Sequence, residues 1–123
     1  MVSGERIQAA AVPYRVSSFG GYEVLLVSRN SGGWGLPKGG VKRIQTPPQA
    51  AAQEALEEAG ILGEIEERLG WFRYRKQGRK NLVHVFPLRV ERVLARWEEE
   101  GTRNRVWVAL SEALRVREQP QGP

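Results

Sequence analysis

Three glutamates, Glu54, Glu57 and Glu58, lie close together in the stretch QEALEEAGI, residues 53–61. On an α-helix each residue turns the chain by about 100°, so the three carboxylates would share roughly 100° of arc on one face. Like charges at these spacings repel one another. A divalent cation such as Mg²⁺ would remove the repulsion, because it binds carboxylate oxygens and keeps waters free for a phosphate substrate. An acidic helix face is more often simply solvated, so the three residues alone leave both interpretations open.

The glycine-rich loop before these glutamates adds a second indication. It ends in Pro-Lys-Gly-Gly, residues 37–40. Glycine allows the backbone to approach a ligand closely, so the carbonyl groups of this loop can add a ligand to the same metal. Lys38 would then place a cation for phosphate beside the metal. Trp34 is a candidate to border the mouth of the site or to stack on a base, the alternative being a role in packing.

Local signals predict the elements that must position these residues. Thr46 is a candidate N-cap, Pro47 suits the first helical turn, and Gln49 can complete a capping box with Thr46. Gly60 is the expected end of this helix, whose apolar back we expect to be Ala52, Ala55, Leu56 and Ala59. We predict strands at 6–16, 22–28, around 34–36, 61–75, 81–93 and 105–110, and a short helix at 111–118 capped by Ser111. This order predicts an α+β or mixed α/β sandwich.

Length and composition limit the class of protein. A chain of 123 residues with 41% apolar and 27% charged residues is typical of one globular domain. We expect that domain to span 1–118 and the tail 119–123 to be disordered. The absence of cysteine excludes disulfides and thiolate chemistry. We find no signal peptide and no run of about 20 apolar residues, which predicts a cytoplasmic protein without a membrane span.

The net charge of +5 is unevenly distributed. The segment RYRKQGRK, 73–80, holds five basic residues and no acidic one, and TRNR, 102–105, adds two more. Such patches can simply keep a surface soluble, but beside an acidic cluster they also suit a polyanion. The candidate phosphate contacts are Arg6, Lys38, Arg73, Arg75, Lys76, Arg79, Arg103 and Arg105. The single histidine, His84, is assigned a structural or surface role.

The stretch GGVKRIQTPPQAAAQEALEEAGI, 39–61, resembles the signature of the Nudix hydrolases. That signature reads Gly, five residues, Glu, seven residues, then Arg-Glu-apolar-x-Glu-Glu-x-Gly-apolar. The positions in register are Gly39, Glu54, Ala55, Glu57, Glu58, Gly60 and Ile61. Gln45 stands where the family has Glu, and Gln53 where it has Arg. Two amides can hydrogen-bond side by side, which predicts that these positions still contact each other without charge.

The resemblance implies a mixed α/β/α sandwich, with a central mixed sheet, one glutamate-bearing helix and a short C-terminal helix. It implies hydrolysis of a phosphoanhydride bond with Mg²⁺ or Mn²⁺, and a monomer or homodimer. Glu54 and Glu58, with the Gly39 carbonyl, are then the metal ligands, and Glu57 is the catalytic base or a further ligand. Substrate contacts are expected from Lys38, Arg6, Arg75, Arg79, Arg103, Arg105 and Trp34.

Within the family, three stretches look most like the diphosphoinositol polyphosphate and diadenosine polyphosphate phosphohydrolases. They are EVLLVSRNSGGWGLPKGG, EEAGILGEIEERLGWF and EEEGTRNRVWVAL. A small-molecule polyphosphate is therefore the expected partner. The alternative is a non-catalytic module that binds a nucleotide or RNA, since Gln45 and Gln53 depart from the signature and WFRYRKQGRK interleaves aromatic and basic residues. The three intact glutamates favour the enzyme.

Overall fold

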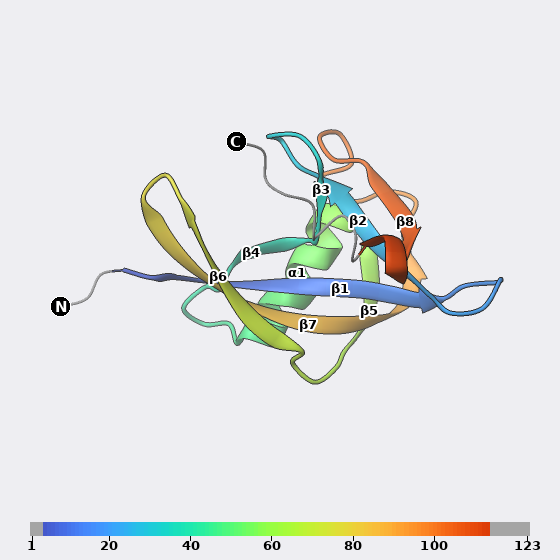
Figure 1. Cartoon of the computed structure of the whole chain (residues 1–123), viewed down its shortest axis with the longest axis horizontal. Helices are drawn as coiled ribbons and strands as arrows, with labels where there is room; N and C mark the ends of the chain where they lie inside the picture. Colours follow the sequence, from blue (N-terminus) through green and yellow to red (C-terminus); the bar gives the residue numbers. More distant parts are fainter. Residues whose placement is uncertain (1–3, 114–123) are drawn as a thin grey trace.

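The computed structural model describes residues 4–113, which form a mixed sheet with one long helix packed on it (Figure 1). Within these residues the elements are β1 (Arg6–Val16), β2 (Tyr22–Ser28), β3 (Trp34–Gly35), β4 (Lys38–Gly40), α1 (Pro47–Ala59), β5 (Ile61–Ile65), β6 (Gly70–Lys76), β7 (Arg79–Val93) and β8 (Arg105–Ala109). A helical turn over 110–113 follows β8. Within this part of the chain, no helix is long and apolar enough to cross a membrane.

Two long strands, β1 and β7, form the centre of the sheet and run parallel to each other. On its other edge β1 pairs antiparallel with β2 and with β4. The other edge of β7 is divided between β5 and β6, both antiparallel. β8 pairs with β2 and β6 pairs with β7, so these two strands lie toward opposite edges of the sheet. The short β4, between these two edges, lies beside α1.

Two strand predictions need correction. The segment 61–75 is not one strand, because the chain leaves β5 after Ile65 and starts β6 at Gly70. Two backbone hydrogen bonds hold the segment between β5 and β6 against β7. Glu66 N donates to Pro87 O (2.9 Å), and Leu69 N donates to Val85 O (2.8 Å). The sequence prediction also missed β4 as a separate strand, since a Lys-Gly-Gly run has low β-propensity and is a strand here through its pairing with β1.

The ends of α1 follow their local signals. The Thr46 side chain accepts a hydrogen bond from the backbone N–H of Gln49, and the Gln49 side chain accepts one from Thr46, as in a capping box. Pro47 occupies the first turn, and Gly60 ends the helix in the left-handed region with φ 66°. The predicted bounds of the helix are therefore confirmed.

The buried side of α1 differs from the prediction. It consists of Ala50, Ala51, Ala55, Glu58 and Ala59, while Ala52 and Leu56 are only partly buried. The prediction puts Ala52, Ala55, Leu56 and Ala59 on the apolar back, but the helix packs with one edge of its acidic arc against the sheet. Glu58 is consequently only 5% exposed. The small alanines allow α1 to lie close to β1, where Ala9 and Ala11 are also fully buried.

The strands bury side chains on both faces of the sheet. One core contains the α1 alanines with Ala9, Ala11, Leu25, Val27, Ile61, Phe86 and Leu88. On the other face Ala10, Val83 and Val85 pack with Val12, Leu36, Phe72 and Tyr74. Of the predicted helix 111–118, the described residues show a turn that already begins at position 110, so Ser111 lies inside it. Residues 114–118 and the predicted tail 119–123 lie outside the described part.

Candidate functional site

Glu54 and Glu58 extend from α1 toward β4, where the backbone of Gly39 receives them. A Cβ atom at position 39 would lie 2.5 and 2.6 Å from the two carboxylate oxygens of Glu54. Only glycine therefore leaves room for this carboxylate against β4. Glu58 Oε1 accepts a hydrogen bond from the backbone N–H of Lys38 at 3.3 Å. The structure thus brings together Glu54, Glu58 and Gly39, the three predicted metal ligands.

Burial dominates the electrostatics of this pair. Burial first, and then the hydrogen bond between its carboxyl group and that of Glu54, raise the pKa of Glu58 to about 8. The pKa of Glu54 is also raised, first by burial. A buried carboxylate is costly unless a positive charge compensates it. These two groups therefore favour either a shared proton or a cation.

Glu57 belongs to a different acidic group. Its carboxylate accepts a hydrogen bond from the Gln53 amide, and its carboxylate oxygens lie within 4.8 Å of those of Glu98 and Glu99. The backbone N–H of Glu99 also donates to the Glu57 carbonyl at 3.0 Å, which fixes the 98–99 segment to the helix. The sequence analysis treated the helix glutamates as one cluster and did not assign Glu98 or Glu99. The acidic run preceding TRNR was the available signal.

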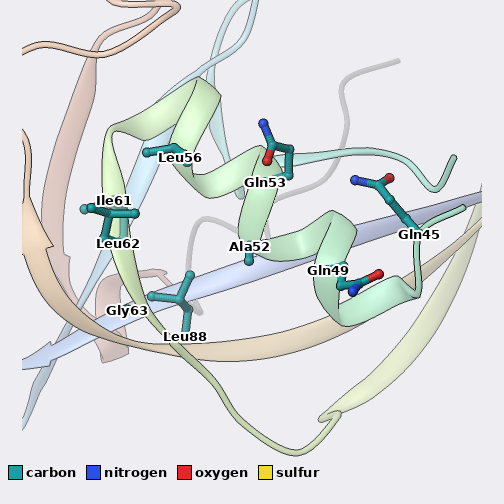
Figure 2. Close-up of a pocket in the computed structure, with 9 residues that line it drawn as sticks. All are labelled: Gln45, Gln49, Ala52, Gln53, Leu56, Ile61, Leu62, Gly63 and Leu88. Atoms are coloured by element: carbon teal, nitrogen blue, oxygen red, sulfur yellow. The ribbon is translucent and has the colours of Figure 1, made fainter.

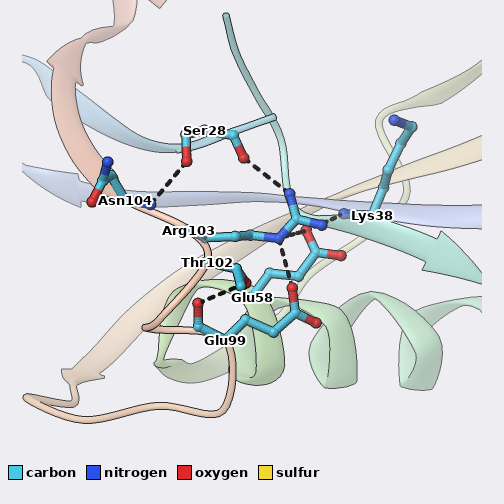
Figure 3. A network of polar contacts seen from close by, with 7 residues as sticks. All are labelled: Ser28, Lys38, Glu58, Glu99, Thr102, Arg103 and Asn104. Carbon is cyan, nitrogen blue, oxygen red and sulfur yellow. Dashed lines mark hydrogen bonds and ion pairs between the residues drawn. The ribbon is translucent and has the colours of Figure 1, made fainter. Parts of the chain in front are cut away.

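Arg103 connects the two acidic groups (Figure 3). Its Nε atom donates to Glu99 Oε1 at 2.6 Å and lies 3.9 Å from Glu58 Oε1. Its Nη1 atom donates to the backbone carbonyl of Ser28 at 2.9 Å. The predicted phosphate contact Arg103 is therefore at the site, where it already contacts β2, α1 and the segment that contains Glu99.

Further cations surround Lys38. Burial first, and then the neighbouring positive charges of Arg29, Lys76 and Arg103, lower the pKa of Lys38 to about 8. The Lys38 ammonium lies 5.3 Å from the centre of the Tyr74 ring. Arg29, which sequence reasoning missed, places its guanidinium over Gly35, where there is no room for a Cβ atom.

Arg6 lies close to this group of cations. Its Nη2 atom would be 3.1 Å from a Cβ atom at Gly40, beside Gly39. Trp34 pairs with Ser28 at the start of β3 and is 40% exposed. The predicted contacts Arg6, Lys38, Arg103 and Trp34 therefore gather around β3 and β4.

The remaining predicted contacts lie elsewhere or are already engaged. Arg75 donates to the Gly78 carbonyl at 3.3 Å in the β6–β7 turn, and with Arg79 it lines a separate hollow. Arg105 donates to the carbonyl groups of Ala59 (2.8 Å) and Leu94 (2.6 Å), and its guanidinium lies 3.9 Å from the centre of the Trp97 ring. Arg105 thus secures the C-terminal end of α1.

Gln45 and Gln53 do not form the predicted amide pair. Gln45 Oε1 accepts from the backbone N–H of Lys42 at 3.0 Å, whereas Gln53 is bonded to Glu57. Both line a hollow of about 420 Å³ on the side of α1 away from β4 (Figure 2). Its floor is apolar, with Leu56, Ile61 and Leu88. Each of the two amides therefore hydrogen-bonds to a residue three or four positions away in the sequence and not to the other amide.

Comparison with known proteins identifies the class of this fold and site. The sequence model of the NUDIX domain matches residues 5–122. The chain therefore belongs to the Nudix family. Nudix hydrolase 21, chloroplastic, of Arabidopsis thaliana is 40% identical over 121 residues, covering 93% of this chain and 61% of that protein. Diphosphoinositol polyphosphate phosphohydrolase 2 of Rattus norvegicus is 40% identical over 98 residues, 76% of this chain and 54% of that protein. The chain thus spans between 54% and 61% of the length of these two relatives.

A solved structure confirms the fold class. The structure titled "Crystal Structure of a C. elegans Ap4A Hydrolase Binary Complex" superposes with a TM-score of 0.75 at 25% identity, covering 94% of this chain and 88% of that one. The predicted α+β Nudix fold is therefore correct. The glutamates on α1 and the loop before it belong to the signature by which that family was first suggested.

Proposed function

We propose that this chain is a divalent-metal-dependent pyrophosphohydrolase that cleaves a phosphoanhydride bond through attack of water on phosphorus. The observation that carries the proposal is the placement of two acidic groups next to Lys38, whose pKa is lowered by the nearby positive charges of Arg29, Lys76 and Arg103 as well as by burial. Carboxylate oxygens can bind a metal ion, and the cations can bind the phosphates that the metal does not contact. Membership of the Nudix family supports the same activity.

The acidic residues fit a divalent cation. Carboxylate and carbonyl oxygens are the ligands that Mg²⁺ takes. The pKa values of Glu54 and Glu58 are raised, first by burial, so a bound cation would stabilise the ionised forms of both carboxyl groups. We assign Glu54, Glu58 and the Gly39 carbonyl to Mg²⁺ or Mn²⁺. The absence of a Cβ atom at position 39 keeps the backbone open to that role. When bound, such a cation neutralises phosphoryl oxygens and lowers the pKa of a bound water.

Glu57 is the proposed base that accepts the proton of the attacking water. The hydrogen bond from Gln53 orients its carboxylate, and Glu98 and Glu99 keep its surroundings negative. A general base has to be held in hydrogen-bonding reach of the proton that it takes. Arg103 contributes by holding both Glu99 and Glu58 near its Nε atom.

The proposed substrate is a polyphosphate of the diadenosine polyphosphate or inositol pyrophosphate type. Lys38, Arg29, Lys76 and Arg6 offer charge-assisted hydrogen bonds to phosphates beyond the bond that is cleaved. Trp34 borders the same region and can stack on a base. Arg105 is excluded from this set because its guanidinium is already bonded to backbone carbonyls. The names of a curated relative and of a solved structure point to the same substrate class.

Cellular location and assembly complete the proposal. We place the chain in the cytoplasm as a monomer or homodimer, although the printed names of some relatives assign those proteins to chloroplasts or mitochondria. Subcellular fractionation and sedimentation of the purified chain test these two points directly.

The enzymatic proposal is tested with a substrate panel in Mg²⁺: diadenosine polyphosphates, inositol pyrophosphates, triphosphorylated RNA, ADP-ribose and nucleoside triphosphates. We expect hydrolysis that stops in excess chelator and falls at least ~10²-fold in Glu58→Gln. Glu67→Gln, at an exposed position outside the site, is the matched control and should retain full activity. Full activity of Glu58→Gln, or activity unaffected by chelator, would contradict the proposal.

A further inference from the structure

The hairpin formed by β6 and β7 has two distinct faces. Because side chains alternate along a strand, Phe72, Tyr74 and Lys76 share one face and Trp71, Arg73 and Arg75 share the other. Tyr74 lies beneath the ammonium of Lys38, so the first face belongs to the proposed phosphate site. The other face, defined by Trp71, Arg73, Arg75 and the cross-strand residue Lys80, is here called the outer hairpin face.

Most of the positive charge on this hairpin is not matched by a carboxylate among the described residues. Arg75 stands directly opposite Lys80, and Lys76 opposite Arg79. Like charges in directly opposed positions destabilise a sheet. Among the described residues, Arg73 pairs with Glu5 (2.6 Å), while Arg75, Arg79 and Lys80 form no ion pair with a carboxylate. These cations, together with Glu5, line a hollow of about 780 Å³.

An exposed aromatic ring adjoins the cations. Trp71 is 53% exposed, although large aromatic side chains are usually buried. The Arg73 guanidinium lies 4.9 Å from the centre of the Trp71 ring, which connects the ring to the hollow. Arg75 lies four positions after Trp71 on β6, about 13 Å further along the strand. A stacking ring beside a basic groove is the arrangement that binds single-stranded nucleic acid.

We propose that the outer hairpin face binds a short single-stranded nucleic acid. Phosphates would contact Arg75 and Lys80, and a base would stack on Trp71 beside Arg73. This binding site is separate from the metal site and requires neither metal nor a phosphoanhydride bond. A compact polyphosphate would use the cations but not the ring, so Trp71 distinguishes the two ligands.

Fluorescence anisotropy with a labelled oligouridine RNA of about ten nucleotides tests the proposal. The RNA carries a 5′-hydroxyl group and the buffer a chelator, so hydrolysis cannot contribute. Trp71→Ala should weaken binding about tenfold. Arg75→Ala with Lys80→Ala should weaken it at least tenfold and reduce the slope of log Kd against log salt by about 1.4, as for two phosphate contacts to a single strand.

Two controls separate this site from general charge and from the catalytic site. Arg43→Ala with Arg92→Ala removes the same charge from exposed positions away from the outer hairpin face, Arg92 lying where β7 pairs with β5, and should change Kd less than twofold. Glu58→Gln should leave RNA binding unchanged. The melting temperature of each variant must lie within a few degrees of that of the parent chain. If Trp71→Ala melts further away, Trp71→Phe, which keeps a ring, replaces it.

Three results would overturn the proposal. An equal loss in both double variants would indicate non-specific attraction. Unchanged binding in Trp71→Ala, with displacement of the RNA by inorganic tripolyphosphate, would indicate a polyphosphate site. Loss of RNA binding in Glu58→Gln would place the RNA at the metal site instead.

Discussion

Glu58 lies between a second carboxyl group and the Arg103 guanidinium, with little access to water. Its environment stabilises the protonated form, whereas its proposed function requires the ionised form. The same side chain should therefore cost stability when no metal is bound and contribute activity when a metal is present. This opposition can be measured as a dependence on pH.

In metal-free protein we predict that Glu58→Gln raises Tm in mildly alkaline solution. An unfolded glutamate titrates near ~4.3, whereas the folded pKa of Glu58 is about 8. The folded state thus holds the proton more tightly, so the penalty is fully present above the folded pKa and declines as pH falls toward the unfolded value. Calorimetry in chelator should show a gain of several degrees near pH ~9 and little gain near pH ~5. A gain independent of pH would contradict this account.

A second prediction concerns Gly39, where a single added methyl group would fill the space that the Glu54 carboxylate occupies. Gly39→Ala would place Cβ 2.5 Å from a carboxylate oxygen of Glu54, so that this side chain must move. We expect kcat/KM to fall by at least ~10²-fold through the loss of a placed ligand, with a much smaller effect on Tm. Gly101→Ala, where a Cβ meets no atom within 4 Å, is the control. Equal activity of the two variants would show that Glu54 is not required in this position.

Helix α1 depends on its two ends as much as on its glutamates. The capping box fixes its start, and its end is secured by Gly60 and by Arg105, which comes from β8. The hydrogen bond from Arg105 also ties the helix to β8, which pairs with β2. A basic side chain at a helix C-terminus stabilises the unpaired carbonyl groups there.

Arg105→Ala should therefore act on stability. It removes two charge-assisted hydrogen bonds and the contact with Trp97, and we expect a loss of about 2 kcal/mol in the free energy of unfolding. Urea denaturation measures this loss, with the exposed Arg92→Ala as control. Because the change does not reach the substrate, kcat/KM should change by the same factor for short and long substrates. A selective loss on long substrates would assign Arg105 to phosphate binding after all.

At the same scale, sequence and structure agree where signals are local. Thr46, Gln49 and Gly60 predicted the ends of α1, and the turn SSFGG predicted the β1–β2 hairpin. The sequence did not reveal that β5 and β6 share one edge of β7, because that division depends on pairing with residues far along the chain. Glu98, Glu99 and Arg29 were missed for the same reason: they reach the site through tertiary contacts. The signature predicted which glutamates matter, but not that Glu57 lies in a separate group.

Over the whole molecule, the cations lie on two sides of the acidic site. Arg103 approaches from the segment before β8, and Lys76 from the end of β6, which lies on the other side of the sheet. Both positive charges act on Lys38, between them. A metal neutralises only the phosphates at the cleaved bond, so further phosphates have to be matched by these side chains.

We therefore predict that kcat/KM rises from ADP-ribose and dinucleoside triphosphates to tetra- and pentaphosphates or inositol pyrophosphates. Arg29→Ala and Lys76→Ala should flatten this rise more than they lower activity on the shortest substrate, while Arg92→Ala should leave it unchanged. Raised salt should flatten it as well, because partly exposed charge contacts are screened. If ADP-ribose proves to be the best substrate, the polyphosphate assignment is wrong although the family assignment stands.

The parallel pairing of β1 with β7 has a consequence for how the chain folds. Arg6 pairs with Asn81, 75 positions later, and the same separation continues to Tyr14 and Arg89. Contacts this distant in sequence form slowly, because a long loop has to close before any of them can form. During synthesis, the β1–β2 hairpin and the glutamate helix emerge well before the strand that completes the sheet between them. Until β7 arrives, one edge of β1 stays unpaired, so the nascent chain is most prone to aggregation during that interval.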